Sequence, residues 1–221
     1  MPDFPTTGHL GVKLCGFTRR EDSEAAIAAG ADALGFNFWP RSKRHLPLEK
    51  ARQWLPSLST SKTALVAVVV NADSLLLEQI ITSRLFHCIQ LHGDETPDDV
   101  SFLMERGLRV IKALQVKDES SLDCIALYAC TDILLDAYNP ALYGGSGESF
   151  PWHLAELARL RHPDKRIILS GGLNPDNVAE AVSQVRPAAV DVASGVESEP
   201  GIKDPAKMAA FVRNARSVLV A

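Results

Sequence analysis

Cys15 and Asp136 carry reactive side chains at the ends of apolar segments. Cys15 ends the segment 12–15, and Lys13 lies two residues before it. Side chains two apart share a face of a strand, so the Lys13 ammonium would lie near the thiol and favour its thiolate form. Asp136 ends the segment 133–136, where an unpaired carboxylate would be costly unless it serves a polar site. Both groups are therefore candidates for a reactive site, although a strand-end cysteine taken alone is more often structural than catalytic.

Two glycine-bearing segments point to an anion site. Gly171 and Gly172 precede Asn174-Pro175, where a helix is expected to open, and Ser194-Gly195 follows another apolar run. Glycines let backbone amides close on an anion at a helix amino terminus, so the pair predicts a phosphate cradle. The alternative for Gly171 and Gly172 is a plain tight turn.

A basic cluster, Arg41, Lys43, Arg44 and His45, follows the second apolar run. A solvated loop would explain it. The functional interpretation is a site for a second anionic group opposite the phosphate, since arginine matches a carboxylate with two parallel hydrogen bonds.

The run Gly144-Gly145-Ser146-Gly147 resembles a fragment of a phosphate loop. It lacks the lysine of a nucleotide-binding loop and the strand-to-helix setting of a dinucleotide fingerprint. A mobile lid over the site is one interpretation, and an ordinary flexible loop is the other.

Eight apolar runs rich in Val, Ile and Leu must position these groups. Such runs, separated by amphipathic stretches, are typical of buried parallel strands joined by crossover helices. The expected strands are residues 12–15, 33–38, 64–70, 88–91, 109–113, 133–136, 167–170 and 189–192. Eight β/α units without a linker predict a single-domain α/β protein, a (β/α)8 TIM barrel, over residues 11–221. Residues 1–10 are expected to form a loose arm.

Helices are expected between the strands, and two have readable starts. Thr96-Pro97 and Asp204-Pro205 each place a capping side chain before a proline. The expected helices are residues 20–29, 48–55, 74–83, 97–105, 174–184 and 205–218, with a poorly marked one near 121–126. Because a β/α barrel builds its active site at the carboxyl ends of its strands, Cys15, Asp136 and the glycine pairs are expected at one rim.

Composition narrows the class of partner. The 221 residues carry a formal net charge of −4 and are 46% hydrophobic, which is ordinary for a globular protein. Nucleic-acid binding is disfavoured without basic stripes, and no apolar run approaches the length of a membrane span. Four cysteines without close pairing indicate reduced thiols. We expect a cytoplasmic protein that binds a small phosphorylated molecule, with oligomeric state open and a monomer favoured.

Several motifs occur together in a specific order. They are Lys13-Leu14-Cys15-Gly16, Gly35-Phe36-Asn37-Phe38, Gln90-Leu91-His92-Gly93, Leu134-Leu135-Asp136, Leu169-Ser170-Gly171-Gly172 and Asp191-Val192-Ala193-Ser194-Gly195-Val196-Glu197 with Pro200-Gly201-Ile202-Lys203-Asp204. Over about residues 11–218 the chain resembles the phosphoribosylanthranilate isomerases of tryptophan biosynthesis. The ordered combination is specific, although each piece alone is not.

The resemblance implies an Amadori rearrangement of N-(5-phosphoribosyl)anthranilate to 1-(2-carboxyphenylamino)-1-deoxyribulose 5-phosphate, with no metal and no organic cofactor. It makes Asp136 the general acid and Cys15 the general base, and it places Arg44 at the anthranilate carboxylate. The resemblance also places a set of further residues around the substrate: Gly171, Gly172, Ser194, Gly195, Asp191, Gln90 and His92. Asp191 could equally hold Lys13, because the last and first strands of a closed barrel are neighbours.

The chain departs from the family pattern at Ser146, where threonine is usual, and at Pro151, where aspartate is usual. The start of the sixth helix is therefore expected to differ. Two other functions stay open from sequence: another sugar-phosphate isomerase or epimerase on the same scaffold, and a phosphosugar-binding protein without turnover. A metal-dependent epimerase would need His and Asp ligands at strand ends, and His92 alone does not supply them.

Overall fold

Eight parallel strands form a closed barrel, as the sequence predicts. The structure is a computed structural model that describes residues 4–5, 8–58, 62–137 and 150–218. The strands pair in chain order and the eighth returns to the first. Their bounds are β1 Gly11–Cys15, β2 Ala33–Asn37, β3 Ala64–Val69, β4 Cys88–Leu91, β5 Val110–Val116, β6 Asp132–Ala137, β7 Arg166–Leu169 and β8 Ala189–Val192.

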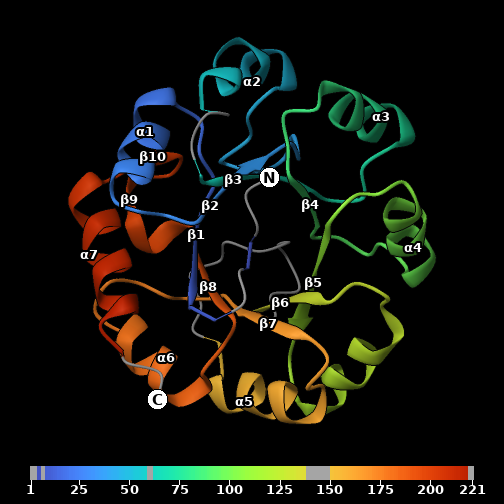
Figure 1. Cartoon of the computed structure of the whole chain (residues 1–221), viewed down its shortest axis with the longest axis vertical. Helices are drawn as coiled ribbons and strands as arrows, with labels where there is room; N and C mark the ends of the chain where they lie inside the picture. Colours follow the sequence, from blue (N-terminus) through green and yellow to red (C-terminus); the bar gives the residue numbers. More distant parts are fainter. Residues whose placement is uncertain (1–3, 6–7, 59–61, 138–149, 219–221) are drawn as a thin grey trace.

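Helices surround the barrel on the outside (Figure 1). Their bounds are α1 Arg20–Ala28, α2 Leu48–Trp54, α3 Ser74–Ser83, α4 Pro97–Glu105, α5 Trp152–Arg161, α6 Val178–Val185 and α7 Pro205–Arg216, with the 3-10 helices η1 Leu55–Leu58, η2 Glu119–Leu127 and η3 Ser194–Val196. A short antiparallel hairpin, β9 Glu197–Glu199 and β10 Ile202–Lys203, follows β8. None of the described helices is long and apolar enough to cross a membrane.

The local signals of helix formation hold in most places. Thr96 caps α4 in a reciprocal capping box, and Asp204 accepts hydrogen bonds from two amides at the start of α7. The expected start at Asn174 is wrong, because α6 begins at Val178. The Asn174 side chain instead accepts hydrogen bonds from the backbone amides of Asp176 and Asn177. These bonds fix a turn where the first helical turn was expected.

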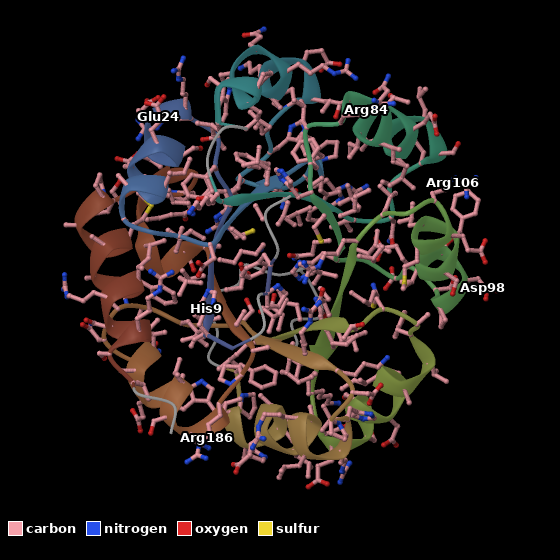
Figure 2. The ribbon with its side chains drawn as sticks, viewed as in Figure 1. His9, Glu24, Arg84, Asp98, Arg106 and Arg186 are labelled. Atoms are coloured by element: carbon pink, nitrogen blue, oxygen red, sulfur yellow. The ribbon has the colours of Figure 1, made fainter. Side chains whose placement is uncertain are left out.

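Two separate apolar cores follow from the alternation of side chains along each strand. One face of each strand packs against the helices, and the other fills the lumen with small and branched residues such as Ala64, Val66 and Ile168. Charged residues such as Glu24, Arg84, Asp98, Arg106 and Arg186 point outward into solvent (Figure 2).

The lumen becomes polar toward the carboxyl ends of the strands. Lys13, Gln90 and Asp191 are almost fully buried there, and Cys15 and Asp136 lie at the rim with 9% and 5% of their surface exposed. Lys13 and Cys15 belong to the same face of β1, as predicted. The apolar interior of the barrel thus ends in a cluster of titratable groups at the carboxyl ends of the strands.

The amino end of the barrel is closed by Phe4, which is only 1% exposed. Its ring lies against Gly11, the first residue of β1, and belongs to the apolar cluster of the lumen that includes Ala189, the first residue of β8. The Pro5 carbonyl accepts hydrogen bonds from Arg109 and Arg166, which both also bind the buried Asp132. The expectation of a loose arm is therefore wrong at Phe4 and Pro5, because an open lumen would expose apolar surface that this ring covers.

We predict that Phe4→Ala lowers the free energy of unfolding by about 3 to 5 kcal/mol, the usual cost of removing a buried aromatic ring. For a chain of this size that corresponds to a melting temperature lower by on the order of 10 °C, measured by circular dichroism. Phe102, 50% exposed on α4, provides the control, and Phe102→Ala should change little. Equal melting temperatures for both variants would show that Phe4 does not close the barrel.

Candidate active site

A cavity of about 260 Å³ opens at the carboxyl ends of the strands. The predicted site residues that line it are Cys15, Arg44, His92, Asp136, Gly171, Gly172, Asp191 and Ser194. Gln90 and Gly195 belong to the same rim but do not line the cavity. The strand-end rule thus brings together residues up to 179 positions apart in the sequence.

Cys15 ends β1 and points into this cavity. Gly35 on β2 pairs with it in register, and a β-carbon at position 35 would lie 2.6 Å from the Cys15 sulfur. Only glycine therefore leaves room for the thiol and for the Lys13 ammonium beside it.

Two opposing influences act on the acidity of Cys15. Burial raises the pKa of the Cys15 thiol above its ordinary value, and the Lys13 ammonium opposes this shift without overcoming it. The expected influence of Lys13 on the thiolate is thus present, but burial, which the spacing of the residues does not reveal, outweighs it. A thiolate with a raised pKa is scarcer at neutral pH and a stronger base once formed.

Lys13 is held by Asp191 across the seam between β1 and β8. The two residues are paired in register, and Lys13 Nζ lies 2.6 Å from Asp191 Oδ1. Although burial alone would lower it, attraction to Asp191 and Cys15 raises the pKa of Lys13 above its ordinary value. Asp191 also accepts a hydrogen bond from the Ser170 hydroxyl. The alternative that Asp191 holds Lys13 is confirmed.

Asp136 faces the cavity from β6. Its Oδ1 accepts a hydrogen bond from the Ala137 amide at 2.9 Å, and His92 Nε2 lies 3.3 Å from its Oδ2. Gln90 bonds the other ring nitrogen of His92 at 2.9 Å and so orients the ring from below. Gln90 is placed behind His92, whereas His92 itself reaches the cavity. Cys15 and Asp136 stand on non-adjacent strands and can act on different atoms of one ligand.

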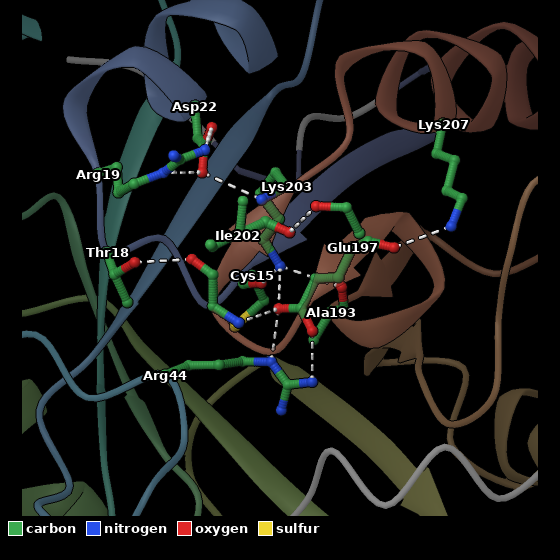
Figure 3. Close-up of polar contacts among 12 residues, drawn as sticks. Cys15, Thr18, Arg19, Asp22, Arg44, Ala193, Glu197, Ile202, Lys203 and Lys207 are labelled. Carbon is green, nitrogen blue, oxygen red and sulfur yellow. Dashed lines mark hydrogen bonds and ion pairs between the residues drawn. The ribbon is translucent and has the colours of Figure 1, made fainter.

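The basic cluster after β2 contributes three residues to the cavity lining, Arg41, Lys43 and Arg44. Arg44 does not extend freely. Its Nε and Nη2 donate to the two carboxylate oxygens of Glu197 at 2.7 and 2.8 Å (Figure 3). His45 instead bridges to Asn37 at the end of β2, which ties the loop to the barrel.

Glu197 and Lys203 form a buried ion pair, which together with Arg44 we call the node. Sequence reasoning assigned no role to Glu197 or Lys203. Lys203 Nζ donates to Glu197 at 2.9 Å and to the backbone carbonyls of Cys15 and Ala193 at 2.6 and 3.0 Å (Figure 3). Both lie inside the motif 191–204, on either side of Pro200-Gly201. A carboxylate and a lysine that flank a proline-glycine turn were the sequence feature from which this pair could have been predicted.

The loops after β7 and β8 meet at one side of the cavity. Gly171 and Gly172 have φ angles of +86° and +69°, which favour glycine. Gly195 packs against the Leu173 carbonyl so closely that a β-carbon there would collide with it. In the described part of the chain the Gly172 amide donates no hydrogen bond. The glycines thus bring the two loops together, with Ser194 and Gly172 at the cavity wall.

The segment 144–147, including Ser146, lies outside the described residues. Pro151 immediately precedes α5 at Trp152, and no side chain caps that helix start. The expected difference from the family at this helix start stays a prediction.

Basic side chains, glycine-bearing loops, a thiol and a carboxyl group surround one small cavity. Arg44 and Lys43 lie on the β2 side, and the glycine-bearing loops lie on the β7 and β8 side. Within the described residues, no group of three or more His, Cys, Asp or Glu side chains is arranged to hold a metal ion. The fold and the site define a β/α-barrel enzyme of the kind that acts on small anionic metabolites.

Comparison with known proteins identifies the family. A family model described as N-(5'phosphoribosyl)anthranilate (PRA) isomerase matches residues 12–214. The chain belongs to the N-(5'-phosphoribosyl)anthranilate isomerase family. A relative of that name from Trichlorobacter lovleyi is 48% identical over 210 residues, which cover 95% of this chain and 100% of the relative. Another, from Geobacter sulfurreducens, is 46% identical over 205 residues, or 93% of this chain and 98% of the relative.

Solved structures agree with the assignment. The phosphoribosyl anthranilate isomerase of Thermotoga maritima is 37% identical, with a TM-score of 0.85 over 95% of this chain and 100% of that one. A phosphoribosyl anthranilate isomerase in complex with reduced 1-(o-carboxyphenylamino)-1-deoxyribulose 5-phosphate is 36% identical, with a TM-score of 0.82 over 95% of this chain and 100% of that one. The barrel and its chain order are thus those of this family.

We predict that Cys15 is alkylated by iodoacetamide with a pH midpoint above that of an unfolded thiol. The thiolate is the reactive form and appears as pH rises through the pKa, so a raised pKa displaces the rise in rate to higher pH. Peptide mass spectrometry would follow Cys15 alone, and the same chain in denaturant supplies the control. A folded-state midpoint at or below the denatured one would contradict the effect of burial.

Proposed function

We propose that this chain converts N-(5'-phosphoribosyl)anthranilate to 1-(o-carboxyphenylamino)-1-deoxyribulose 5-phosphate, with Asp136 as general acid and Cys15 as general base. The observation that carries the proposal is that both side chains line one cavity, between the basic loop after β2 and the glycine-bearing loops after β7 and β8. An aminoaldose needs an acid to open its ring and a base to remove the proton from C2, and the two groups supply both.

Asp136 would act first. A proton from its carboxyl group moves to the ring oxygen, the bond from C1 to that oxygen breaks, and the anthranilate nitrogen stabilises C1 as an iminium. The Ala137 amide holds Oδ1, and Oδ2 is the oxygen directed toward His92. A carboxyl group that is fixed in this way presents its proton from one direction, and such fixed orientation lowers the barrier to proton transfer.

Cys15 would then remove the proton from C2. The electron pair of that C–H bond forms the C1–C2 double bond, and the iminium nitrogen regains its lone pair. The resulting enolamine becomes the aminoketone when C1 takes up a proton with the electron pair of the C1–C2 double bond, and the C2 hydroxyl loses its proton as the C2=O bond forms. Burial makes the thiolate a strong base, and Lys13 lies beside it to limit the cost of its charge.

The two ends of the substrate would set the pose. The phosphate would lie on the loops carrying Gly172 and Ser194, because amides close on an anion there. The carboxylate would lie at Arg44. The node at Arg44 joins two cationic side chains, Arg44 and Lys203, with one carboxylate, Glu197. A second carboxylate from the substrate would balance the remaining positive charge.

Loss of anthranilate fluorescence during substrate consumption tests the reaction and substrate together. We predict that Cys15→Ala and Asp136→Asn each lower kcat by about 10²- to 10⁴-fold with the fold intact. The double variant should lose little more than the weaker single variant, because groups in one reaction coordinate overlap. A folded Cys15→Ala that kept more than about a tenth of wild-type kcat, a difference of only about 1.4 kcal/mol, would remove Cys15 as the base. Tight substrate binding without turnover by the wild type would indicate a binding protein.

Arg44→Ala should weaken substrate capture by about 2 to 5 kcal/mol, since it removes a bidentate charged contact. Arg44→Lys should restore only part of the loss because lysine lacks the planar fork. Calorimetry with two product analogues, with and without the aromatic carboxylate, makes the comparison. If Arg44→Ala weakens both analogues equally, Arg44 supports the loop and does not contact the carboxylate.

A further inference from the structure

We propose that Glu197 is a positioning residue for substrate selection: it holds one edge of the Arg44 guanidinium so that the other edge faces the cavity. Selectivity for a carboxylate-bearing substrate would then depend on a residue that does not touch the substrate. The inference rests on the proposed function, because it deepens the role of Arg44 in that site.

The geometry of the ion pair divides the guanidinium. Glu197 takes the Nε and Nη2 side at 2.7 and 2.8 Å, which is one of the two edges of the fork. In the described part of the chain no acceptor binds Nη1 of Arg44. Arg44 lines the cavity, so the edge formed by Nη1 and the remaining Nη2 hydrogen is available for a second, parallel carboxylate pair.

Glu197 can hold Arg44 because Glu197 is itself immobilised. Its side chain is 5% exposed, and Lys203 and the Gly201 amide both donate to Oε1. Lys207 binds its backbone carbonyl from α7 at 2.9 Å. Although burial alone would raise it, the hydrogen bonds and charges of Arg44 and Lys203 hold the pKa of Glu197 below its ordinary value, so Glu197 stays ionised.

Arg44 approaches Glu197 along a fixed path. Its side chain crosses Gly16, the residue after Cys15, where a β-carbon would collide with the Arg44 methylenes. Gly16 has a φ of +87°, which also favours glycine. The stem is thus confined by Gly16 and the head by Glu197. A long arginine side chain otherwise loses much rotamer freedom on binding, and this confinement has already removed it.

The same node reaches the proposed base. Lys203 Nζ donates to the Cys15 carbonyl at 2.6 Å and to Glu197 at 2.9 Å (Figure 3). One buried ammonium therefore fixes both the strand end that carries Cys15 and the carboxylate that holds Arg44. Lys203 thus links the position of Cys15 to the position of the Arg44 guanidinium, which is the proposed contact for the substrate carboxylate.

Glu197→Gln tests the proposal, because it keeps the shape and replaces one acceptor by an amide that faces the guanidinium. Glu199→Gln is the control, since it removes the same charge from an exposed position of the same hairpin. Affinity is measured by calorimetry for the reduced product analogue with its carboxylate and for the same analogue without it. We expect Glu197→Gln to weaken the first by about 10- to 100-fold and the second by less than about 3-fold, as for one lost charged hydrogen bond. Glu199→Gln should change neither.

A double variant separates positioning from general damage. In an Arg44→Ala background, Glu197→Gln should change carboxylate-analogue affinity by less than about 3-fold, because the group it positions is gone. Glu197→Asp, which withdraws the carboxylate by one methylene, should show an intermediate selectivity and serves if the Gln variant does not fold.

Equal weakening of both analogues by a folded Glu197 variant, or an undiminished effect without Arg44, would overturn the positioning role. Its failure is distinct from failure of the proposed function, which would appear as absence of turnover in the wild-type chain.

Discussion

The ion pair between Lys13 and Asp191 is the interaction on which the site depends. It crosses the seam where β8 closes onto β1, at 2.6 Å, with the lysine side chain fully buried. Burying two charges costs several kcal/mol per ion, and only a short, well-bonded pair offsets that cost. The pair therefore fixes the register at which the barrel closes. That register places Cys15 at the rim, Ser170 beside Asp191 and the glycine-bearing loops next to each other.

Much of the scaffold could be predicted because its signals are local. Eight apolar runs gave eight strands, and the strand-end rule brought Cys15 and Asp136 to one cavity. What sequence reasoning missed depends on distant pairing or on competing magnitudes. Arg44 and Glu197 are 153 positions apart, and nothing near either residue indicates the other. The raised pKa of Cys15 is a balance in which burial outweighs Lys13, and spacing alone reveals only the second influence. Phe4 belongs to a proline-containing segment with polar neighbours, and only its contact with Gly11 shows that its ring is buried.

Burial of Cys15 has two opposing effects on its thiolate form. A small apolar lumen leaves little water to stabilise a thiolate, yet the same burial makes the thiolate a better proton acceptor. Lys13, held by Asp191, and Lys203, at the Cys15 carbonyl, moderate that cost without removing it. Gly35 keeps the neighbouring space clear. Asp136 has a different surrounding, with a backbone amide on one oxygen and His92 near the other. The two side chains thus occupy one cavity in unlike environments.

The contacts between the first and last β/α units bear on the order in which the chain is synthesised and folds. The strand that carries Cys15 and the loop that carries Arg44 leave the ribosome early, whereas Asp191, Glu197 and Lys203 belong to the last β/α unit. Chains emerge from the amino terminus and fold as segments become available. A nascent chain that ends before residue 191 has neither the partner of Lys13 nor the carboxylate that holds Arg44. The first and last strands of the barrel must therefore meet before the site exists, and the site can assemble only after the segment 191–203 has been made.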